Sequence, residues 1–373
     1  MAVLNSSLNR QGVGYNHLMA TVEQQITHED APAYVDGMLD RALAAGASDI
    51  HVEPIEDGSE IRFRVDGLLT TVEKLPTDIG RSIVLRLMVM AQLLTYRLDI
   101  PQEGRIRNKA LDLRLAIMPV AHGLRAAIRL PAELTQPREL GALGLPSECL
   151  IQLERFTRAD GGMLLVTGPA GSGKTTTIYA LLEEISRKCL GLSIISLEDP
   201  IERHVKGITQ IEVAPHGQMT YERALKSILR QDPQVLMLGE IRDVATARVA
   251  VQAALSGHRL IATMHAGEPA TALARLLEMG IEPYQITSSL FGVLTQRLVR
   301  RTTSEGYKGR VPLAEFGGMD DGVRQAVLGR GDAESLRNSF ASQSGHATLR
   351  MMADRYVTQG LTDAAEVRRV LGE

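Results

Sequence analysis

Hydrophobic and polar positions follow helical and strand periods in the first third of the chain. Apolar side chains recur at helical spacing from residue 31 to Leu43, and Gly46 ends this predicted helix. Residues 60–65 instead alternate apolar and polar positions, Asp66-Gly67 is a hairpin signal, and residues 68–72 can return as the partner strand. One helix and one two-stranded hairpin are therefore expected before residue 75.

The same design repeats further along the chain. Alternating segments occur at 111–117 and 126–130, and residues 81–94 carry apolar side chains at helical spacing. These elements predict a small α/β domain over 31–135, with a PAS-like arrangement of helices on one face of a sheet. Residues 1–30 are polar with few large apolar side chains, so we expect a flexible tail there.

A different pattern follows residue 146. Short apolar runs alternate with helical stretches, which is typical of a parallel sheet covered on both faces. Residues 136–146 are rich in proline and glycine and predict a linker, and 147–373 predict a second domain whose part from about 302 is helical. The predicted strands of this domain are 163–166, 193–197, 235–238 and 260–263.

Composition narrows the functional classes. The chain has 373 residues, 44% of them hydrophobic, and no apolar run approaches the ~20 residues of a membrane span. No secretory signal is visible at the N-terminus, so we expect a cytoplasmic protein. Cys149 and Cys189 form no C-x-x-C pair, which argues against a disulfide framework or a zinc knuckle. A net charge of −3 and 3% aromatic residues argue against nucleic acid as a partner.

One segment carries a specific chemistry. Residues 168–175 read G-P-A-G-S-G-K-T, after an apolar run and before a helical stretch. Glycines let backbone N–H groups close around phosphate oxygens, and the helix N-terminus favours an anion. The domain is therefore predicted to be a RecA-like P-loop NTPase domain that binds ATP and Mg²⁺, with Lys174 on the β/γ-phosphates and Thr175 on the metal. The predicted nucleotide-binding residues are Gly168, Pro169, Ala170, Gly171, Ser172, Gly173, Lys174, Thr175 and Thr176.

Acidic residues at the ends of neighbouring strands supply the remaining chemistry. Glu198 follows the 193–197 run and is a candidate general base for water, while Glu240 follows 235–238 and could hold Mg²⁺ through water. The sequence leaves open which of the two is the base. His265 follows the next strand, either as a γ-phosphate sensor or as a structural side chain.

Arginines are the other candidates, because hydrolysis needs positive charge near the transferring phosphoryl group. Arg62 and Arg64 share one face of a predicted strand, and Arg105 follows in the same domain. From spacing alone, a solvated strand face is the favoured interpretation of Arg62 and Arg64.

Together these segments resemble the type II secretion and type IV pilus assembly ATPases, over roughly residues 31–315. The resemblance rests on several motifs beyond the P-loop. They are A-S-D-I-H-V-E-P at 47–54, I-R-F-R-V-D-G at 61–67, P-Q-E-G-R at 101–105, E-D-P-I-E at 198–202, L-R-Q-D-P at 229–233, G-E-I-R-D at 239–243, the histidine box at 257–265, M-G-I-E-P at 279–283 and Q-R-L-V-R at 296–300.

The resemblance implies a motor that acts as a ring homo-hexamer. ATP turnover would power pseudopilus or pilus assembly through an inner-membrane platform protein, so that the enzyme is peripheral to that membrane. Arg62, Arg64 and Arg105 would clamp the nucleotide across domains. Catalytic roles would fall to these arginines and to Glu198, Glu240 and His265, with Glu240 and Thr175 at the metal.

The chain departs from the family pattern at several points. Residues 301–310 contain no cysteine where the assembly branch carries a zinc module, so no structural zinc is expected. Only about thirty residues precede the first matched helix, so we expect no extra N-terminal domain. Ala266-Gly267 and Gln234 replace the usual residues at their positions. The alternatives are a pilus retraction or type IV secretion-like motor, a RecA-like nucleic-acid translocase and a regulator that does not hydrolyse ATP.

Overall fold

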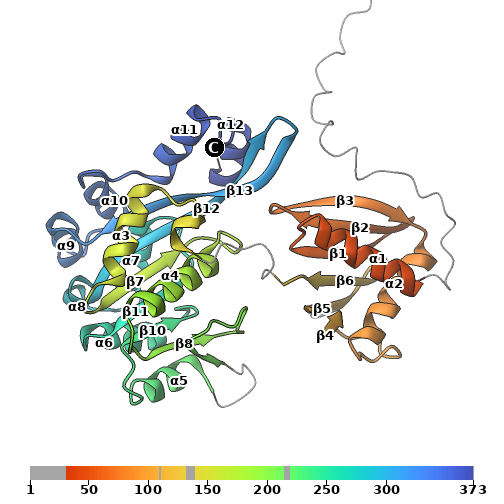
Figure 1. Ribbon diagram of the computed structural model, residues 1–373, viewed down its shortest axis with the longest axis horizontal. Helices are drawn as coiled ribbons and strands as arrows, with labels where there is room; N and C mark the ends of the chain where they lie inside the picture. The colour runs from red at the N-terminus through yellow and green to blue at the C-terminus, as the bar shows by residue number, and fades with distance from the viewer. Residues whose placement is uncertain (1–30, 109–110, 132–138, 214–218, 373) are drawn as a thin grey trace, which may run out of the picture. The chain divides into compact units, whose positions relative to one another are not determined.

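The computed structural model describes residues 31–108, 111–131, 139–213 and 219–372. The chain divides into two compact units (Figure 1). Unit 1 comprises residues 1–135 with 303–309, and unit 2 comprises 136–302 with 310–373. The predicted tail over 1–30 lies outside the described residues.

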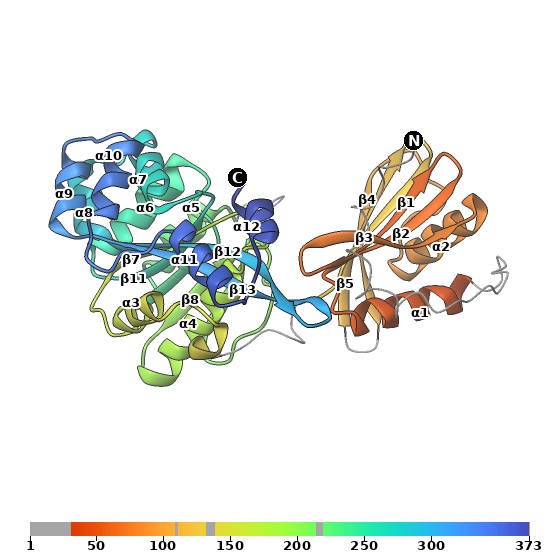
Figure 2. The ribbon, with the colours of Figure 1, turned by 90° about the horizontal axis from the view of Figure 1, so that it is seen from above.

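Unit 1 is a six-stranded antiparallel sheet with two helices on one face (Figure 2). The strand order is β3-β2-β1-β6-β5-β4. Inward-facing residues such as Ile50, Ile61 and Leu115 pack against Met38 of α1 and Leu87 of α2. The elements are α1 (Ala31–Ala44), β1 (Asp49–Ile55), β2 (Gly58–Val65), β3 (Leu68–Leu75), α2 (Thr77–Met90), β4 (Gln102–Asn108), β5 (Leu111–Val120) and β6 (Gly123–Arg129).

The turn between β2 and β3 follows from its sequence. Asp66 and Gly67 have φ of 49° and 85°, the left-handed values that a two-residue type I′ turn requires at both central positions. The alternation of 60–65 then places Ile61 and Phe63 against the helices and Arg62 and Arg64 on the opposite face.

Unit 2 is built on a seven-stranded sheet of order β13-β12-β7-β11-β10-β8-β9. Strands β12, β7, β11, β10, β8 and β9 run parallel to one another. The elements are η3 (Leu140–Leu143), α3 (Ser147–Thr157), β7 (Gly162–Thr167), α4 (Lys174–Lys188), β8 (Ile194–Glu198), β9 (Thr209–Glu212), α5 (Tyr221–Ile228), β10 (Val235–Leu238), α6 (Val244–Leu255), β11 (Arg259–Met264), α7 (Pro269–Glu278), α8 (Pro283–Ser289), β12 (Leu290–Thr303), β13 (Gly306–Gly318), α9 (Asp321–Leu328), α10 (Ala333–Ala341), α11 (Leu349–Thr358) and α12 (Ala364–Leu371).

Both faces of this sheet are buried, as the continuous apolar runs predict. Met163 and Leu165 of β7 pack into one core with α5 to α8, whereas Leu164 and Val166 pack into a second core with α3 and α4. The predicted fold class, an α/β P-loop domain with a parallel sheet preceded by a smaller α/β domain, is thus confirmed.

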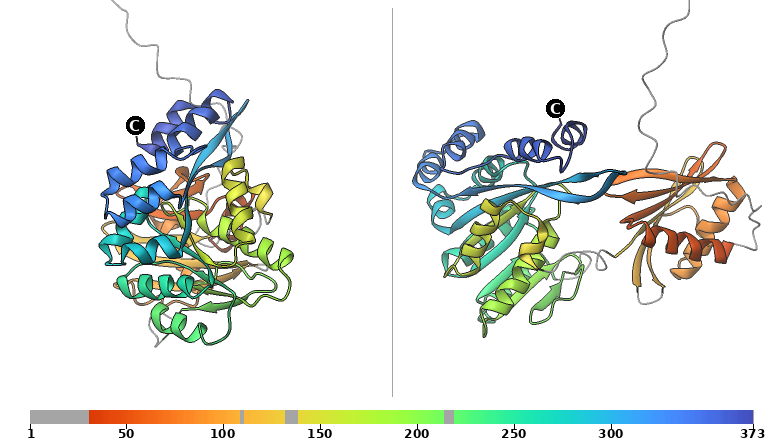
Figure 3. Two further views of the ribbon diagram at one scale, coloured as in Figure 1. Left: turned by 90° about the vertical axis from the view of Figure 1, so that its left-hand side faces the viewer. Right: turned by 45° about the horizontal axis from the view of Figure 1, so that its top comes forward.

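The prediction that the chain is helical from about residue 302 is wrong for its first part. Strand β12 continues to Thr303, and a short turn leads into β13, so the two strands run side by side as a long hairpin (Figure 3). Thr302, Thr303 and Tyr307 have strand propensity, and Gly306 adopts a φ of 112° beside the turn. The polar residues around the turn between β12 and β13 give no apolar alternation, so the sequence pattern did not indicate strands there.

The predicted linker also differs in part. Residues 132–138 lie outside the described part of the chain, but 139–146 include η3 and place Leu140 and Leu145 in the core of unit 2. Among the described residues, no helix has the length and apolar character needed to cross a membrane.

Candidate nucleotide site

The P-loop joins β7 to α4 in a backbone shape that only glycine tolerates. Gly168, Gly171 and Gly173 have φ of 142°, 72° and 91°. A Cβ on Gly168 would lie 2.5 Å from the carbonyl oxygen of Gln296, well inside contact distance. Positive φ values and this close approach explain the glycine spacing. The loop therefore has the compact form in which successive N–H groups can surround a phosphate.

Lys174 begins α4 and folds back over this loop. Its Nζ donates to the carbonyl oxygens of Gly168 at 2.8 Å and Pro169 at 2.9 Å. Burial lowers the pKa of Lys174. The negative charge of Glu240 acts against this shift, and the positive charge of Arg297 adds to it. Lys174 therefore shares its surroundings with two acids, Glu240 and Glu202, and one further cation, Arg297.

Glu240 lies beyond the end of β10 and pairs with the histidine that follows β11. Its Oε1 is 3.0 Å from His265 Nε2, and its Oε2 accepts from Arg242 Nε at 2.5 Å. Arg242 also pairs with Asp199 at 3.4 Å, so groups from the ends of β8, β10 and β11 form one chain of charges. The structure thus brings Glu240, His265 and Lys174 together, as the sequence predicts for strand ends at one sheet edge.

Glu198 has a different environment from Glu240. It ends β8, is 3% exposed, and accepts hydrogen bonds from Ser196 Oγ at 2.5 Å and Gln210 Nε2 at 3.0 Å. The hydroxyl of Tyr179, from α4, donates to its other oxygen. Both carboxylate oxygens are therefore engaged by protein donors, and Glu198 joins the P-loop helix to β8 and β9.

Tyr179 was missed in the sequence because it reads as a core position of α4. Its hydroxyl also accepts from the backbone N–H of Glu202 at 3.2 Å, and the guanidinium of Arg203 lies 5.3 Å from its ring centroid. Hydrogen bonding to Glu198 and burial raise the pKa of Tyr179, with burial the larger cause. This side chain fixes the start of the loop after β8.

The three candidate arginines lie in unit 1, and each has an acidic neighbour. Arg62 is 3.9 Å from Glu53, and Arg64 Nε is 3.4 Å from Asp49. Arg105 on β4 pairs with a carboxylate of β5 at 3.3 Å. The pairs of Arg62 and Arg64 are half-buried and that of Arg105 is exposed, and with N···O distances of 3.3–3.9 Å all three are loose, so the guanidinium groups can exchange partners.

Strand register places two further arginines beside them. Arg64 pairs across the sheet with Asp49, Asp49 with Arg129, Arg129 with Arg114, and Arg114 with Arg105. These five residues form an arginine row on the face opposite the helices. Arg114 and Arg129 are exposed. Alternation marked both positions as outward-facing, but only the register of the sheet shows that they align.

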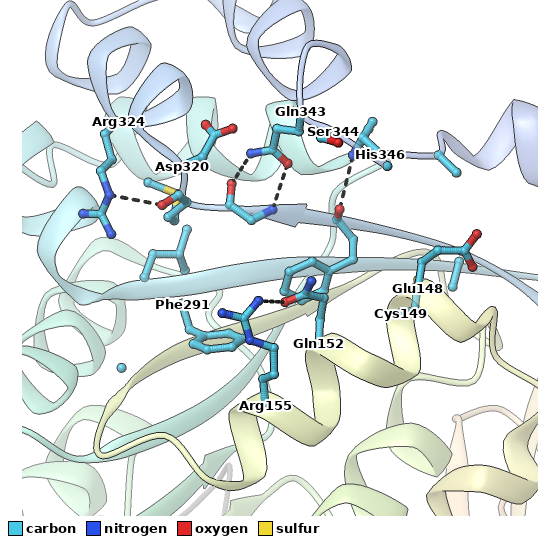
Figure 4. Close-up of a pocket in the computed structure, with 18 of the residues that line it drawn as sticks. Glu148, Cys149, Gln152, Arg155, Phe291, Asp320, Arg324, Gln343, Ser344 and His346 are labelled. Atoms are coloured by element: carbon cyan, nitrogen blue, oxygen red, sulfur yellow. Dashed lines mark hydrogen bonds between the residues drawn. The ribbon is translucent and has the colours of Figure 1, made fainter.

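A cavity lies elsewhere in unit 2, away from the P-loop. Its volume is about 590 Å³, and its lining comes from α3, the β12–β13 hairpin and residues 343–347 (Figure 4). Charged side chains of both signs line it, including Arg155, Arg324 and Asp320, and no P-loop residue does. Cavity volume is therefore a poor guide to the nucleotide site, since a P-loop presents backbone N–H groups rather than a deep pocket. The described residues contain no cluster of three metal-ligating side chains.

Comparisons of the sequence and the fold with known proteins identify a family of secretion proteins. The family model "Type II/IV secretion system protein" matches residues 25–369. The type II secretion system protein HxcR of Pseudomonas aeruginosa is 38% identical, and the match covers 92% of this chain and 78% of that protein. The type II secretion system ATPase E of Vibrio cholerae is 36% identical over 93% of this chain and 77% of its own length.

A solved structure shows the same fold. The ATPase DotB of Yersinia pseudotuberculosis superposes with a TM-score of 0.75 at 22% identity, covering 94% of this chain and 96% of that one. The family resemblance expected from the motifs is confirmed, whereas the roles of individual site residues stay predictions. With a family match over most of its length and relatives above 35% identity, the chain belongs to the type II/IV secretion system protein family.

Proposed function

We propose that this protein is a cytoplasmic ATP-hydrolysing motor, peripheral to the inner membrane, for type II secretion pseudopilus or type IV pilus assembly. It acts as a homo-hexamer and delivers work to an inner-membrane platform protein. The observation that carries the proposal is the P-loop with Lys174 beside the Glu240–His265 pair at one edge of the sheet of unit 2. Family membership identifies the system in which such a site works.

The residues of the site fit a magnesium nucleotide. Loop N–H groups and Lys174 hold the phosphates, and the partly exposed Thr175 supplies a hydroxyl ligand for Mg²⁺. Glu240 binds the hydration shell of the metal. Mg²⁺, when bound, neutralises charge on the phosphate oxygens.

Glu240 is also the carboxylate that we assign to the attacking water. It is 16% exposed, and its partners Arg242 and His265 are more than half exposed, so water reaches the group. Glu198 could act as the base only after releasing Tyr179 or the donors on its other oxygen. His265, paired with Glu240, would report the state of the terminal phosphate to β11.

Arg62, Arg64 and Arg105 are proposed to supply positive charge to a nucleotide across a domain or subunit boundary. Support comes from their position on the open face of the unit 1 sheet, where the arginine row concentrates cationic groups. Because their carboxylate pairs are long, at 3.3–3.9 Å, and solvent reaches all of them, a triphosphate can compete for these arginines. Coupling of phosphate state to domain angle would follow.

The proposal is tested by ATP-dependent phosphate release with light scattering for mass, on wild type, Glu240→Gln and Glu198→Gln. Glu278→Gln is the matched control, because this carboxylate is exposed on α7. A hexamer that hydrolyses ATP, with loss of turnover in Glu240→Gln and normal turnover in the control, is expected. We expect Glu198→Gln to lower the melting temperature as well as turnover.

Two results would contradict the proposal. A wild type that binds ATP without phosphate release, even with a platform protein present, would indicate a regulator. Stimulation of turnover by single-stranded DNA would indicate a translocase.

The assignment of the base has its own test. Full turnover in Glu240→Gln together with loss of turnover in a stably folded Glu198→Gln would make Glu198 the base.

A further inference from the structure

Arg297 lies on β12 next to the P-loop. Strand β12 pairs in parallel with β7, and Thr295 is opposite Thr167, so Arg297 is beyond the paired region at the edge where the P-loop begins. The preceding carbonyl, that of Gln296, is the atom that a Cβ on Gly168 would meet at 2.5 Å. The backbone of β12 at this point thus touches the P-loop.

The side chain of Arg297 extends across the end of β7. Its Nη1 donates to the carbonyl of Gln296 at 3.0 Å, and its Nη2 donates to the carbonyl of Gly267 at 3.3 Å. Gly267 follows β11, which lies on the other side of β7 from β12. The guanidinium therefore spans the carboxyl end of the strand that leads into the P-loop. These bonds use two of the five N–H donors of a guanidinium.

Arg297 forms no ion pair among the described residues, although the negative charge of Glu315 acts on it at longer range. No carboxylate among these residues lies within 4.0 Å of it, unlike Arg300, which pairs with Glu366 at 2.6 Å on the same strand. Burial lowers the pKa of Arg297, and its positive charge in turn lowers the pKa of Lys174. Carboxylates attract both cations, Glu240 and Glu202 acting on Lys174 and Glu315 on Arg297, but none of them pairs with Arg297. The two cations repel each other, so an anion bound between them would be stabilised by both.

We propose that Arg297 is a phosphate-binding residue, which contacts the phosphates of a nucleoside di- or triphosphate in the P-loop of the same chain. The inference rests on the proposed nucleotide binding and adds a cation from β12 to the loop, Lys174 and the arginines of unit 1. In this proposal the remaining N–H donors of Arg297 would bind the same phosphate groups as Lys174. Its bond to Gly267 links that contact to the loop carrying His265.

Three substitutions separate the phosphate contact from a structural role. Arg297→Gln keeps an amide donor for the Gly267 carbonyl but removes the charge, whereas Arg297→Lys keeps the charge. Arg297→Ala removes both. Arg301→Ala is the matched control, because Arg301 is an exposed arginine on the same strand.

The measurement is binding of fluorescent N-methylanthraniloyl (mant) derivatives of ATP, ADP and adenosine to the full chain. We expect Arg297→Gln and Arg297→Ala to weaken mant-ATP and mant-ADP about tenfold or more, as for loss of a charge-assisted hydrogen bond. Arg297→Lys should recover part of this loss, and binding of mant-adenosine should stay unchanged. The control should match wild type.

Normal affinity of Arg297→Gln for mant-ATP would overturn the inference and leave Arg297 as a support for Gly267. An equal loss for all three ligands, with a lowered melting temperature, would also overturn it, because a distorted site does not select for phosphates. If wild type fails to bind mant-ATP, the proposed function itself fails, and that result is distinct from a defect seen only in the variants.

Discussion

Substitution of Glu366 by Gln should remove a large, pH-dependent part of the stability of unit 2. Glu366 on α12 is fully buried and accepts hydrogen bonds from Arg300 N and Nε at 2.9 Å and from Arg369 Nε at 2.8 Å. Burial raises its pKa, but the bonds from Arg369 and Arg300 outweigh this and lower the pKa from 4.5 to about 2. Glutamine keeps the shape of the side chain and loses the charge.

The pKa shift sets the magnitude. At about 1.36 kcal/mol per pKa unit, the shift of Glu366 corresponds to about 3 kcal/mol, or a melting temperature lower by about 6–12 °C for a domain of this size. Because the folded pKa is depressed, this stability is present above pH 4.5 and is lost as the pH falls towards 2. The gap between wild type and variant should therefore be full at pH 7 and reduced by about 2 kcal/mol at pH 3.

The assay is thermal unfolding of the full chain from pH 7 to pH 3, with hydrogen exchange of residues 364–371 as a local probe. Glu282→Gln is the control, because its ion pair with Arg330 at 2.9 Å is exposed and is expected to contribute less than about 1 kcal/mol. A gap that is equal at every pH, or no larger than that of the control, would refute the reasoning.

Three further predictions test other parts of unit 2. Gly168→Ala should abolish ATP binding measured by calorimetry, because the added Cβ collides with the backbone of β12 and displaces the P-loop. The collision is local, so circular dichroism should stay normal; tight binding of ATP would contradict the P-loop geometry. Tyr179→Phe should lower the stability by about 2 kcal/mol in urea unfolding, since Glu198 loses a buried donor; an unchanged midpoint would count against the buried network. At pH 8, iodoacetamide should modify Cys189 and spare Cys149, because burial raises the pKa of Cys149 to about 12 and covers its thiol; mass spectrometry of peptides reads the outcome, and equal labelling would contradict it.

Much of the fold could be predicted because local pattern and tertiary structure agree in it. The run 235–238 coincides with β10, and 163–166 lies within β7, since a buried parallel strand is apolar on both faces. The P-loop and Glu240 were identifiable for the same reason, because strand ends at one sheet edge meet.

The features that escaped prediction depend on long-range contacts. Strand β13 carries polar side chains over its exposed first residues, so the hydrophobic pattern gave no strand signal there. Tyr179 is linked to Glu198 over 19 residues and Arg297 to Gly267 over 30, which no local spacing encodes. Whether Glu198 faced water or protein likewise depended on Gln210 from β9, a short strand without a clear pattern.

The arginine row has a consequence for how unit 1 folds. Side chains on a strand alternate between faces, so a slip of one residue in β2, β4, β5 or β6 would turn Arg64, Arg105, Arg114 or Arg129 towards α1 and α2. Burying an unpaired guanidinium among Met38, Leu87 and their neighbours is far more costly than any hydrogen bond that the slipped pairing preserves. The arginine row therefore makes misaligned strand pairings energetically unfavourable while the sheet assembles, independently of any anion that the row binds in the folded protein.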